Sequence, residues 1–392
     1  MSTVRVEGVV KKFFTQASLF KGKGEVVIAL DHVHLNVREG EVFCIIGPSG
    51  CGKSTLLRVI AGVEQADEGN IYIDEKKVNN VAPKDRRVGM VFQNLALYPH
   101  MSVRKNLAFS LKMRNLPEDI IRKKIKLACH ILGDEFEYLL ERKPKTLSEG
   151  QKRRVALGRC IVQDAKVFLM DEPLANLDPR SSMQIRLEMM QLLTRLQRTT
   201  IYVTHDQHEV PSVAKRVGIM REGRLEQVGT FDEIYNNPVN RFVATFLGDP
   251  PMNLIRMVLK EDKKGLYLID PPFRIDLPRE AFGILKEKGY LWEEILVGIR
   301  PEHIKIKGEE NNFPFSCEFK GMVQATGVSL SRLLAYILVG NQIVVAAFDP
   351  FLKLQIGEVL PLSFSLNRAI FFDPVSGKAI YRLPYNEENA GY

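Results

Sequence analysis

The segment GPSGCGKST, residues 47–55, has the residue types and spacing of a loop that binds phosphate groups. Its glycines allow successive backbone N–H groups to turn inward around an anion, Lys53 adds a positive charge, and the Ser54 hydroxyl can ligate Mg²⁺. A short apolar run precedes the segment at residues 41–46, and a helical pattern follows it at residues 53–63. This strand, loop and helix context favours a phosphate site over a chance glycine-rich turn.

A second segment, VFLMDE, ends a strand pattern in two carboxylates. Asp171 can hold Mg²⁺ through water, and Glu172 can orient and deprotonate an attacking water molecule. Such a pair can also merely cap the next element, so the phosphate loop is what favours hydrolysis of a nucleoside triphosphate. Three further polar residues stand where strand patterns end and could contact water, metal or γ-phosphate, although each alone is more typical of a cap or a loop: Gln93, Asp178 and His205.

The surrounding elements predict how these residues are positioned. Strand and helix patterns alternate through KVFLMDE, PRSSMQIRLEMMQLLTRLQR and TTIYVTH, which indicates a parallel sheet covered by helices. Helical periodicity dominates from residue 103 to residue 160, and a Pro/Asn-rich joint near residues 236–255 leads to many short β-rich runs. We therefore predict an α/β domain over residues 1–240 and a β-rich barrel or sandwich over residues 241–392.

Composition sets broad limits on the function. The chain has 392 residues, of which 45% are hydrophobic and 26% charged, and these values are typical of globular domains rather than disordered chains. The net charge of +8 is compatible with nucleic acid, phosphate ligands or an anionic membrane face. The five cysteines lack metal-ligand spacing, which favours reduced thiols in the cytosol. We find neither a signal peptide nor an apolar run of about 18 residues, so work at a membrane would be that of a peripheral protein.

The order GPSGCGKST, VFQ, LSEGQ, VFLMDEP, LANLD and TH resembles the ATP-binding subunits of ABC transporters over about the first 240 residues. NLALYPHMSVRKN, RKPKTLS, IYVTHDQ and RFVATFLGDPPMN are similar to the maltose/oligosaccharide importer branch, and GIRPEHI and FDPVSGKAI resemble its regulatory domain. The resemblance implies an α/β fold: a P-loop ABC ATPase domain with a helical subdomain at about residues 94–160, then a small all-β oligonucleotide-binding-like (TOBE-type) domain. Residues 305–346 depart most from that pattern.

The resemblance also implies roles for individual residues. ATP binding falls to Phe13, Phe14, Gly47, Pro48, Ser49, Gly50, Cys51, Gly52, Lys53, Ser54 and Thr55, with one of the two phenylalanines stacking on adenine. Mg²⁺ would be held, partly through water, by Ser54, Gln93 and Asp171, and catalysis would fall to Glu172 as general base with His205 and Gln93. A signature segment that covers the ATP of a partner subunit would be Leu147, Ser148, Glu149, Gly150 and Gln151, and the D-loop would be Ala175, Asn176, Leu177 and Asp178.

By this resemblance the chain uses ATP and Mg²⁺ to energise import of a sugar, oligosaccharide or glycerol phosphate-type solute. It would act as a homodimer, or as a heterodimer with a related ATPase chain, on the cytoplasmic face of the plasma membrane. Residues 95–99 and the helices after them would grip one of two integral membrane permease subunits. An extracytoplasmic solute-binding protein would deliver the solute to these permease subunits. Alternatives are a polyamine, iron or sulfate importer, or a soluble ABC ATPase acting on nucleic acid, which we do not expect because paired cassettes and zinc modules are lacking.

Two residues depart from the family pattern. Glu149 replaces the first glycine of the signature, where a carboxylate about 5 Å from a triphosphate would cost roughly one kcal/mol or more. We expect this side chain to face solvent or the basic run 152–154, and we favour a tolerated first-turn residue over a deliberately weakened signature. Pro211 falls where a helix after His205 would continue, so we expect the helix to restart there.

Overall fold

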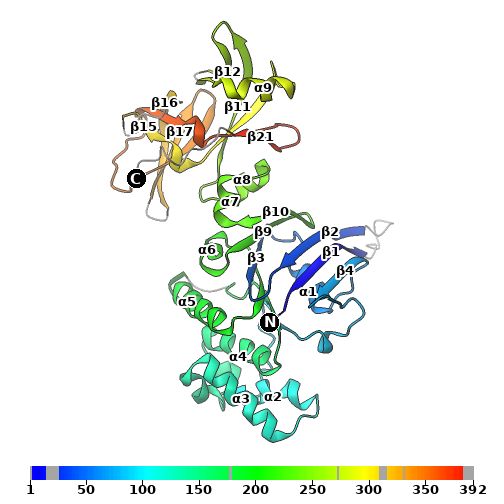
Figure 1. Cartoon of the computed structure of the whole chain (residues 1–392). Coiled ribbons are helices and arrows are strands. Elements are labelled where there is room, and N and C mark those ends of the chain that lie inside the picture. The colour runs from blue at the N-terminus through cyan, green and yellow to red at the C-terminus, as the bar shows by residue number, and fades with distance from the viewer. Residues whose placement is uncertain are drawn as a thin grey trace, which may run out of the picture. The chain divides into compact units, whose positions relative to one another are not determined.

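A computed structural model of the chain describes residues 2–14, 26–175, 179–271, 273–308, 316–329 and 332–382. Contacts divide the chain into two compact units, Met1–Asp232 and Glu233–Tyr392 (Figure 1). Each unit has its own sheets and its own hydrophobic core, so each is described separately.

The central sheet of the first unit is mainly parallel. Its strand order is β10-β9-β3-β8-β7-β6, in which only β10 pairs antiparallel with its neighbour. Strands β7 and β8 are buried along their whole length, as expected for a parallel sheet with both faces covered. The bounds are Val42–Ile46 (β3), Val88–Val91 (β6), Val167–Asp171 (β7), Thr199–Thr204 (β8), Arg216–Arg221 (β9) and Arg224–Thr230 (β10). The predicted parallel sheet is confirmed.

An antiparallel sheet with the order β2-β1-β4-β5 lies beside it. Its strands are Val4–Phe14 (β1), Val26–Val37 (β2), Glu68–Ile73 (β4) and Lys76–Lys77 (β5). Alternate residues of β1, including Val4 and Val6, are buried and join one core with Leu56 and Ile60 of the first helix. This core fixes the helix that follows the phosphate loop against both sheets.

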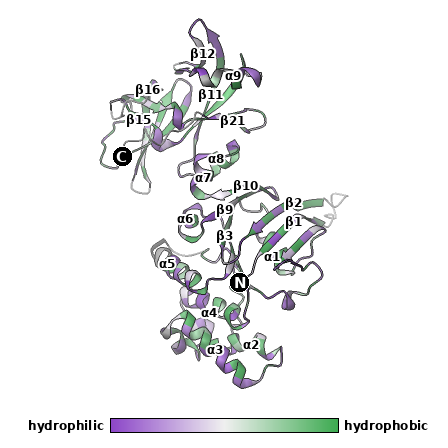
Figure 2. Ribbon diagram, in the orientation of Figure 1, coloured by the Kyte–Doolittle hydropathy of each residue, from purple (hydrophilic) through white to green (hydrophobic). Residues whose placement is uncertain are grey.

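The first unit contains helices that follow its strands and a cluster of three helices, α2, α3 and α4. The bounds are Lys53–Ala61 (α1), Val103–Lys112 (α2), Glu118–Leu132 (α3), Glu149–Val162 (α4), Pro179–Leu196 (α5) and Val210–Val213 (α6). Helices α2, α3 and α4 pack on one another and form the expected helical part, and Figure 2 shows hydrophobic and hydrophilic residues alternating along their ribbons. Pro211 lies in the first turn of α6, after a 3-10 turn at Gln207–Glu209, so the predicted restart of the helix is confirmed.

The second unit is built mainly from antiparallel strands. One sheet has the order β13-β12-β11-β14-β20-β21 and the other the order β15-β19-β16-β17-β18, and their inner faces share a core. The strands are Asn253–Asp262 (β11), Gly265–Asp270 (β12), Phe273–Asp276 (β13), Glu294–Ile299 (β14), Lys305–Ile306 (β15), Ser316–Ser329 (β16), Arg332–Val339 (β17), Gln342–Phe348 (β18), Val359–Ser365 (β19), Ile370–Phe372 (β20) and Ala379–Arg382 (β21). Helices Arg241–Phe246 (α8) and Arg279–Glu287 (α9) accompany the predicted β architecture, and Phe231–Asn236 (α7) spans the division between the units.

A buried arginine explains why contacts place residues 233–247 in the second unit. Arg300 is 2% exposed and donates hydrogen bonds to the backbone carbonyls of Tyr235, Ala244 and Leu247. Its guanidinium also stacks on the Tyr235 ring, 3.8 Å from the ring centroid. These contacts tie residues 233–247 to the β-rich part of the chain, although the sequence places them upstream of it.

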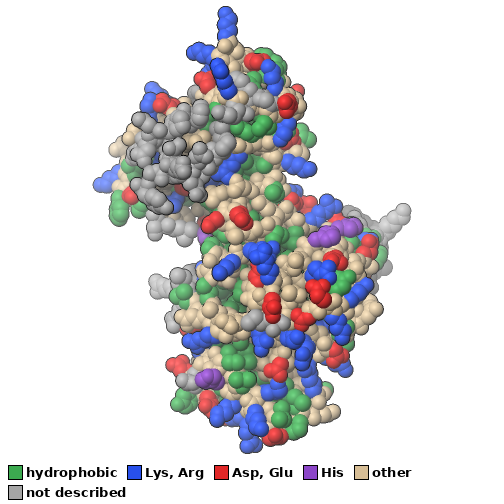
Figure 3. All heavy atoms as spheres, in the orientation of Figure 1, with side chains coloured by type: hydrophobic (Ala, Val, Ile, Leu, Met, Phe, Trp, Pro, Cys, Tyr) green, Lys and Arg blue, Asp and Glu red, His purple; other side chains and the backbone are tan. Residues whose placement is uncertain are grey.

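The positive charge of the chain is concentrated in its helical part. Lysines and arginines clearly outnumber aspartates and glutamates in residues 94–160. Figure 3 shows lysine and arginine side chains with hydrophobic ones over the region where α2 and α3 lie. Among the described residues, no helix is both long enough and apolar enough to span a membrane.

Candidate functional site

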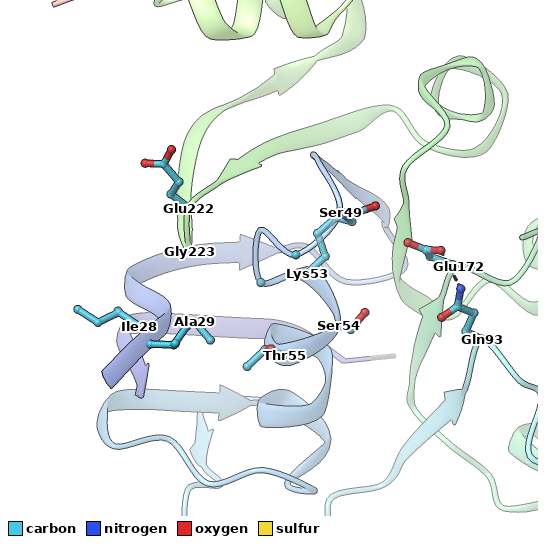
Figure 4. A pocket seen from close by; sticks show the side chains of 13 residues that line it. Ile28, Ala29, Ser49, Lys53, Ser54, Thr55, Gln93, Glu172, Glu222 and Gly223 are labelled. Carbon is cyan, nitrogen blue, oxygen red and sulfur yellow. Dashed lines mark hydrogen bonds between the residues drawn. The ribbon is translucent and has the colours of Figure 1, made fainter. Parts of the chain in front are cut away.

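A cavity of about 380 Å³ in the first unit brings most of the predicted phosphate loop together. Figure 4 shows Ile28 and Ala29 on one side, Lys53 on the loop, and Gln93 and Glu172 facing each other on the opposite side. The cavity is lined by Val27, Ile28, Ala29, Ser49, Gly50, Gly52, Lys53, Ser54, Thr55, Gln93, Glu172, Glu222 and Gly223. It therefore has one aliphatic end and one end rich in groups that can bind or cleave a phosphate chain.

Lys53 holds the phosphate loop in shape. Its ammonium group donates to the carbonyls of Gly47, at 2.8 Å, and of Pro48, at 2.9 Å, and the residue is only 4% exposed. Lys53 is also the first residue of α1, where backbone N–H groups lack intrahelical acceptors and the helix dipole favours negative charge. Loop, ammonium and helix start together fit an anion such as a triphosphate.

Two glycines of the loop are required by close backbone approaches. A Cβ on Gly52 would lie 2.3 Å from the Ala29 carbonyl oxygen, and Gly52 has a φ of +107°. A Cβ on Gly47 would lie 2.1 Å from the Met220 carbonyl oxygen. Any side chain at either position would push β2 or β9 away from the loop.

Ser54 and Asp171 form a hydrogen-bonded pair of side chains that carry oxygen atoms. The Ser54 hydroxyl donates to Asp171 Oδ1 at 2.7 Å, and Asp171 is 4% exposed at the end of β7. Burial raises the pKa of Asp171, against which the Ser54 hydrogen bond and the charges of Arg58 and Lys53 act. Hydroxyl and carboxylate oxygens suit Mg²⁺, which takes few protein ligands beside substrate phosphates and water. The donor set therefore fits the predicted metal.

Glu172 is held between the ends of three neighbouring strands. Gln93 Nε2 donates to Glu172 Oε2 at 3.2 Å, and His205 Nδ1 lies 3.2 Å from the same oxygen. The Glu172 side chain is 16% exposed, whereas that of His205 is 55% exposed. These residues follow β6, β7 and β8, so the parallel sheet brings them together as predicted.

The backbone of Glu172 has an unusual conformation. Its φ is +46°, which a non-glycine residue rarely adopts, and its N–H donates to the Val203 carbonyl at 2.9 Å. Its own carbonyl accepts a hydrogen bond from Ala175 N at 3.1 Å, which closes a tight turn directly after the strand. This turn aims the carboxylate at the cavity.

Some of the residues predicted to bind ATP or to form the D-loop do not line the cavity or lie outside the described residues. Cys51 is buried, and Gly47 and Pro48 contact Lys53 without lining the cavity. Phe13 and Phe14 are 37% and 78% exposed at the end of β1, and neither is a lining residue. Of the predicted D-loop, Ala175 is described, and Asn176, Leu177 and Asp178 lie outside the described residues.

The aliphatic end of the cavity was missed by sequence reasoning. Val27, Ile28 and Ala29 come from β2, and Glu222 and Gly223 come from the turn between β9 and β10. Gly223 joins the two parts, because its N–H donates to the Cys51 carbonyl and its carbonyl accepts from Asp31 N, both at 2.9 Å. The sequence carries no signal for these residues, because Val27 is placed by its pairing with Phe13 across β1 and β2.

Comparisons with known proteins agree with this geometry. The chain matches the family model described as ABC transporter over residues 30–175, and the model described as MalK OB fold domain over residues 248–304. It is 45% identical to the oligosaccharides import ATP-binding protein MsmX of Bacillus subtilis, covering 88% of this chain and 93% of the relative. The trehalose/maltose import ATP-binding protein MalK of Thermococcus litoralis is 40% identical, covering 93% of this chain and 98% of the relative.

A solved structure agrees as well. The cbiO1 protein of Clostridium perfringens, described as part of an ABC transporter complex, matches with a TM-score of 0.52 and 31% identity, covering 60% of this chain and 90% of that one. The chain belongs to the ATP-binding subunits of ABC transporters. The expected ABC ATPase fold with an oligonucleotide-binding-like C-terminal domain is confirmed.

The predicted signature of this ATP-binding subunit lies at the start of α4. The Ser148 side chain accepts from Gln151 N at 3.3 Å, and the Gln151 side chain accepts from Ser148 N at 3.1 Å, which forms a capping box. Glu149 turns away along the helix, and its carboxylate pairs with Lys152 at 2.6 Å with half of the side chain exposed. The expectation that Glu149 would face solvent or the basic run is confirmed, because the side chain does both.

We expect Glu149→Gly to change the ATPase rate by no more than about twofold, because an exposed pair of this spacing contributes only a few tenths of a kcal/mol. The measurement is the steady-state rate of the purified subunit at several protein concentrations. Glu149→Gln is the matched control, since it removes the charge without adding the flexibility of glycine. A rise of tenfold or more in both variants would instead make this carboxylate a brake on the site.

Proposed function

We propose that this subunit hydrolyses ATP to energise an ABC importer for a sugar, an oligosaccharide or a glycerol phosphate-type solute. The observation that carries the hydrolytic part is the contact of Glu172 with Gln93 and His205 at the edge of the phosphate-loop cavity. The cargo is supported by relatives named for oligosaccharides, trehalose/maltose and glycerol 3-phosphate.

The proposed chemistry uses the chain's own groups. Phe13 or Phe14, Val27 and Ile28 would contact the base, and Lys53 with the first N–H groups of α1 would bind the phosphates. Ser54, Gln93 and Asp171 would hold Mg²⁺, which when bound offsets negative charge on the phosphates.

Glu172 would orient a water molecule and accept its proton as the oxygen attacks the γ-phosphorus. The bond between that phosphorus and the bridging oxygen then breaks, and ADP leaves with the electron pair. Gln93 and His205, both within 3.2 Å of the carboxylate, would keep it aligned and contact the water or the γ-phosphate. The turn at Glu172, with its φ of +46°, supports this assignment, because it leaves the side chain lining the cavity.

The proposed assembly is a dimer of ATPase chains beneath two permease subunits. In it the signature, Leu147, Ser148, Glu149, Gly150 and Gln151, would cover ATP on the partner subunit, and Ala175, Asn176, Leu177 and Asp178 would serve as the D-loop. The ATPase domain would comprise about residues 1–240 and the regulatory TOBE-type domain residues 241–392, and the subunit would sit peripherally on the cytoplasmic face. An exposed helical part rich in lysine and arginine is compatible with such a docking role.

The cargo is tested by uptake in cells that lack the gene for this chain. We expect uptake of labelled oligosaccharide, maltose or glycerol 3-phosphate to fall to background, and to return with the wild-type gene but not with Glu172→Gln. Polyamine, iron and sulfate serve as parallel substrates. Loss confined to one of these would reassign the cargo, and unchanged uptake of all of them would contradict the import role.

A further inference from the structure

Three consecutive basic residues of α4 have three different surroundings. Lys152 pairs with Glu149 near the surface, and Arg154 pairs with Glu188 of α5. Arg153 instead points into the unit and is 5% exposed. A buried guanidinium is costly unless its donors are used, so its partners show what it holds in place.

Those partners are two backbone carbonyls in the segment that directly follows Glu172, the proposed catalytic base. Arg153 Nε donates to the Pro173 carbonyl, and Nη2 donates to the Ala175 carbonyl at 2.8 Å. The same short segment is closed by the hydrogen bond from Ala175 N to the Glu172 carbonyl. The conformation of the Glu172 turn thus depends on one hydrogen bond that Glu172 N donates to the Val203 carbonyl of β8 and on one within the turn. Two more are donated by a helix that begins at the signature.

We propose that Arg153 is a positioning residue that couples the signature helix to the turn carrying Glu172. Any shift of α4 that accompanies closure of the signature over a partner's nucleotide would be transmitted to the backbone beside the base. This inference rests on the proposed roles of Glu172 and of the signature. The planar guanidinium suits the task, because it reaches two carbonyls with a fixed spacing, which the single ammonium group of lysine does with less precision.

The charge surrounding Arg153 agrees with a buried cation that stays ionised. Burial lowers the pKa of Arg153, and the negative charges of Glu149 and Glu209 oppose that change together with the Tyr202 hydroxyl. Nη1 is buried and has no hydrogen-bond partner within the described part of the chain. A residue needed only for packing would gain from an aliphatic side chain at this place, so the two carbonyl contacts are its most direct purpose.

The test compares Arg153→Met, Arg153→Lys and Arg86→Met in the full-length subunit. Arg86 is the matched control: it is 6% exposed and donates to the carbonyls of Val59, Ile60, Asn79 and Val81, far along the chain from Glu172. For Arg153→Met we expect kcat per folded protein to fall about 10- to 100-fold, as for other small misplacements of a catalytic group. The KM for ATP should stay within about twofold, because the phosphate loop is untouched. Arg153→Lys should recover part of the rate.

Arg86→Met should lower the melting temperature while keeping kcat per folded protein. The inference is overturned if Arg153→Met keeps a wild-type kcat, or if it merely loses stability as Arg86→Met does. Should Arg153→Met not fold, Arg153→Lys decides by its kcat at unchanged KM, a full wild-type rate overturning the inference. Glu172→Gln distinguishes failure of the proposed function from failure of the coupling. If Glu172→Gln still hydrolyses ATP, the proposed catalytic role of Glu172 is wrong. If Glu172→Gln is inactive while Arg153→Met is fully active, only the positioning role of Arg153 is wrong.

Discussion

Replacing Glu172 with glutamine is expected to reduce ATP hydrolysis by about 100- to 10,000-fold, the range typical of losing a general base. The amide keeps the size of the side chain and can still contact Gln93 and His205, but it cannot accept a proton from water. Nucleotide binding should persist, because Lys53 and the loop are unchanged. Phosphate release measures the first effect, and equilibrium binding of a fluorescent ATP analogue measures the second.

The control for this prediction is Glu118→Gln, which makes the same chemical change at an exposed position of α3, where the glutamate pairs with Lys112. That variant should hydrolyse ATP at the wild-type rate. If Glu172→Gln retained half of the wild-type activity, another group would have to accept the proton. The exposed His205 would then be the next residue to replace.

Lys53→Met is expected to weaken ATP binding by roughly 10- to 100-fold, because a hydrogen bond to a charged group is worth about 1.5–3 kcal/mol. The methionine chain fills a similar space, yet it supplies neither the charge for the phosphates nor the donors that hold the Gly47 and Pro48 carbonyls. Hydrolysis should fall with binding. Calorimetric titration with ATP and Mg²⁺ gives the dissociation constant directly.

Lys76→Met provides the comparison, since Lys76 is exposed on β5 and loses the same ammonium group. Its affinity for ATP should equal that of the wild type. The proposal that Lys53 binds the phosphates of ATP would be contradicted if Lys53→Met bound ATP with unchanged affinity. Loss of folding is separated from loss of binding by measuring the melting temperature of both variants without nucleotide.

The phosphate end of the site could be predicted because its determinants are close together in the chain. Strand β3, the loop and α1 follow one another without interruption, and glycine, lysine and serine are required there by backbone geometry and charge. Gln93, Glu172 and His205 come from distant segments. They were still predictable as a group, because the ends of adjacent parallel strands share one edge of the sheet.

The aliphatic end of the cavity depended on the tertiary structure. Nothing in the order of residues marks Val27 or Ile28 as more than strand residues, and only pairing with β1 and the approach of Gly223 place them at the cavity. The start of the second unit is a similar case. It depends on the contacts of Arg300 with carbonyls that precede it by more than fifty residues.

The basic run of α4 shows, within a few residues, both what the sequence predicts and what the fold decides. The sequence predicted that Glu149 would face solvent or the basic run 152–154, in which Lys152 and Arg153 are both near neighbours because i+3 and i+4 residues lie on the same side of a helix. The fold decided between them: one side of α4 packs against the segment after Glu172, so Arg153 is buried with the Pro173 and Ala175 carbonyls and Lys152 is left at the surface for Glu149. Sequence by itself determined the chemistry of the phosphate loop, because that chemistry is local, whereas the packing of α4 on the end of β7 decided that Arg153 is the basic residue that contacts the segment after Glu172.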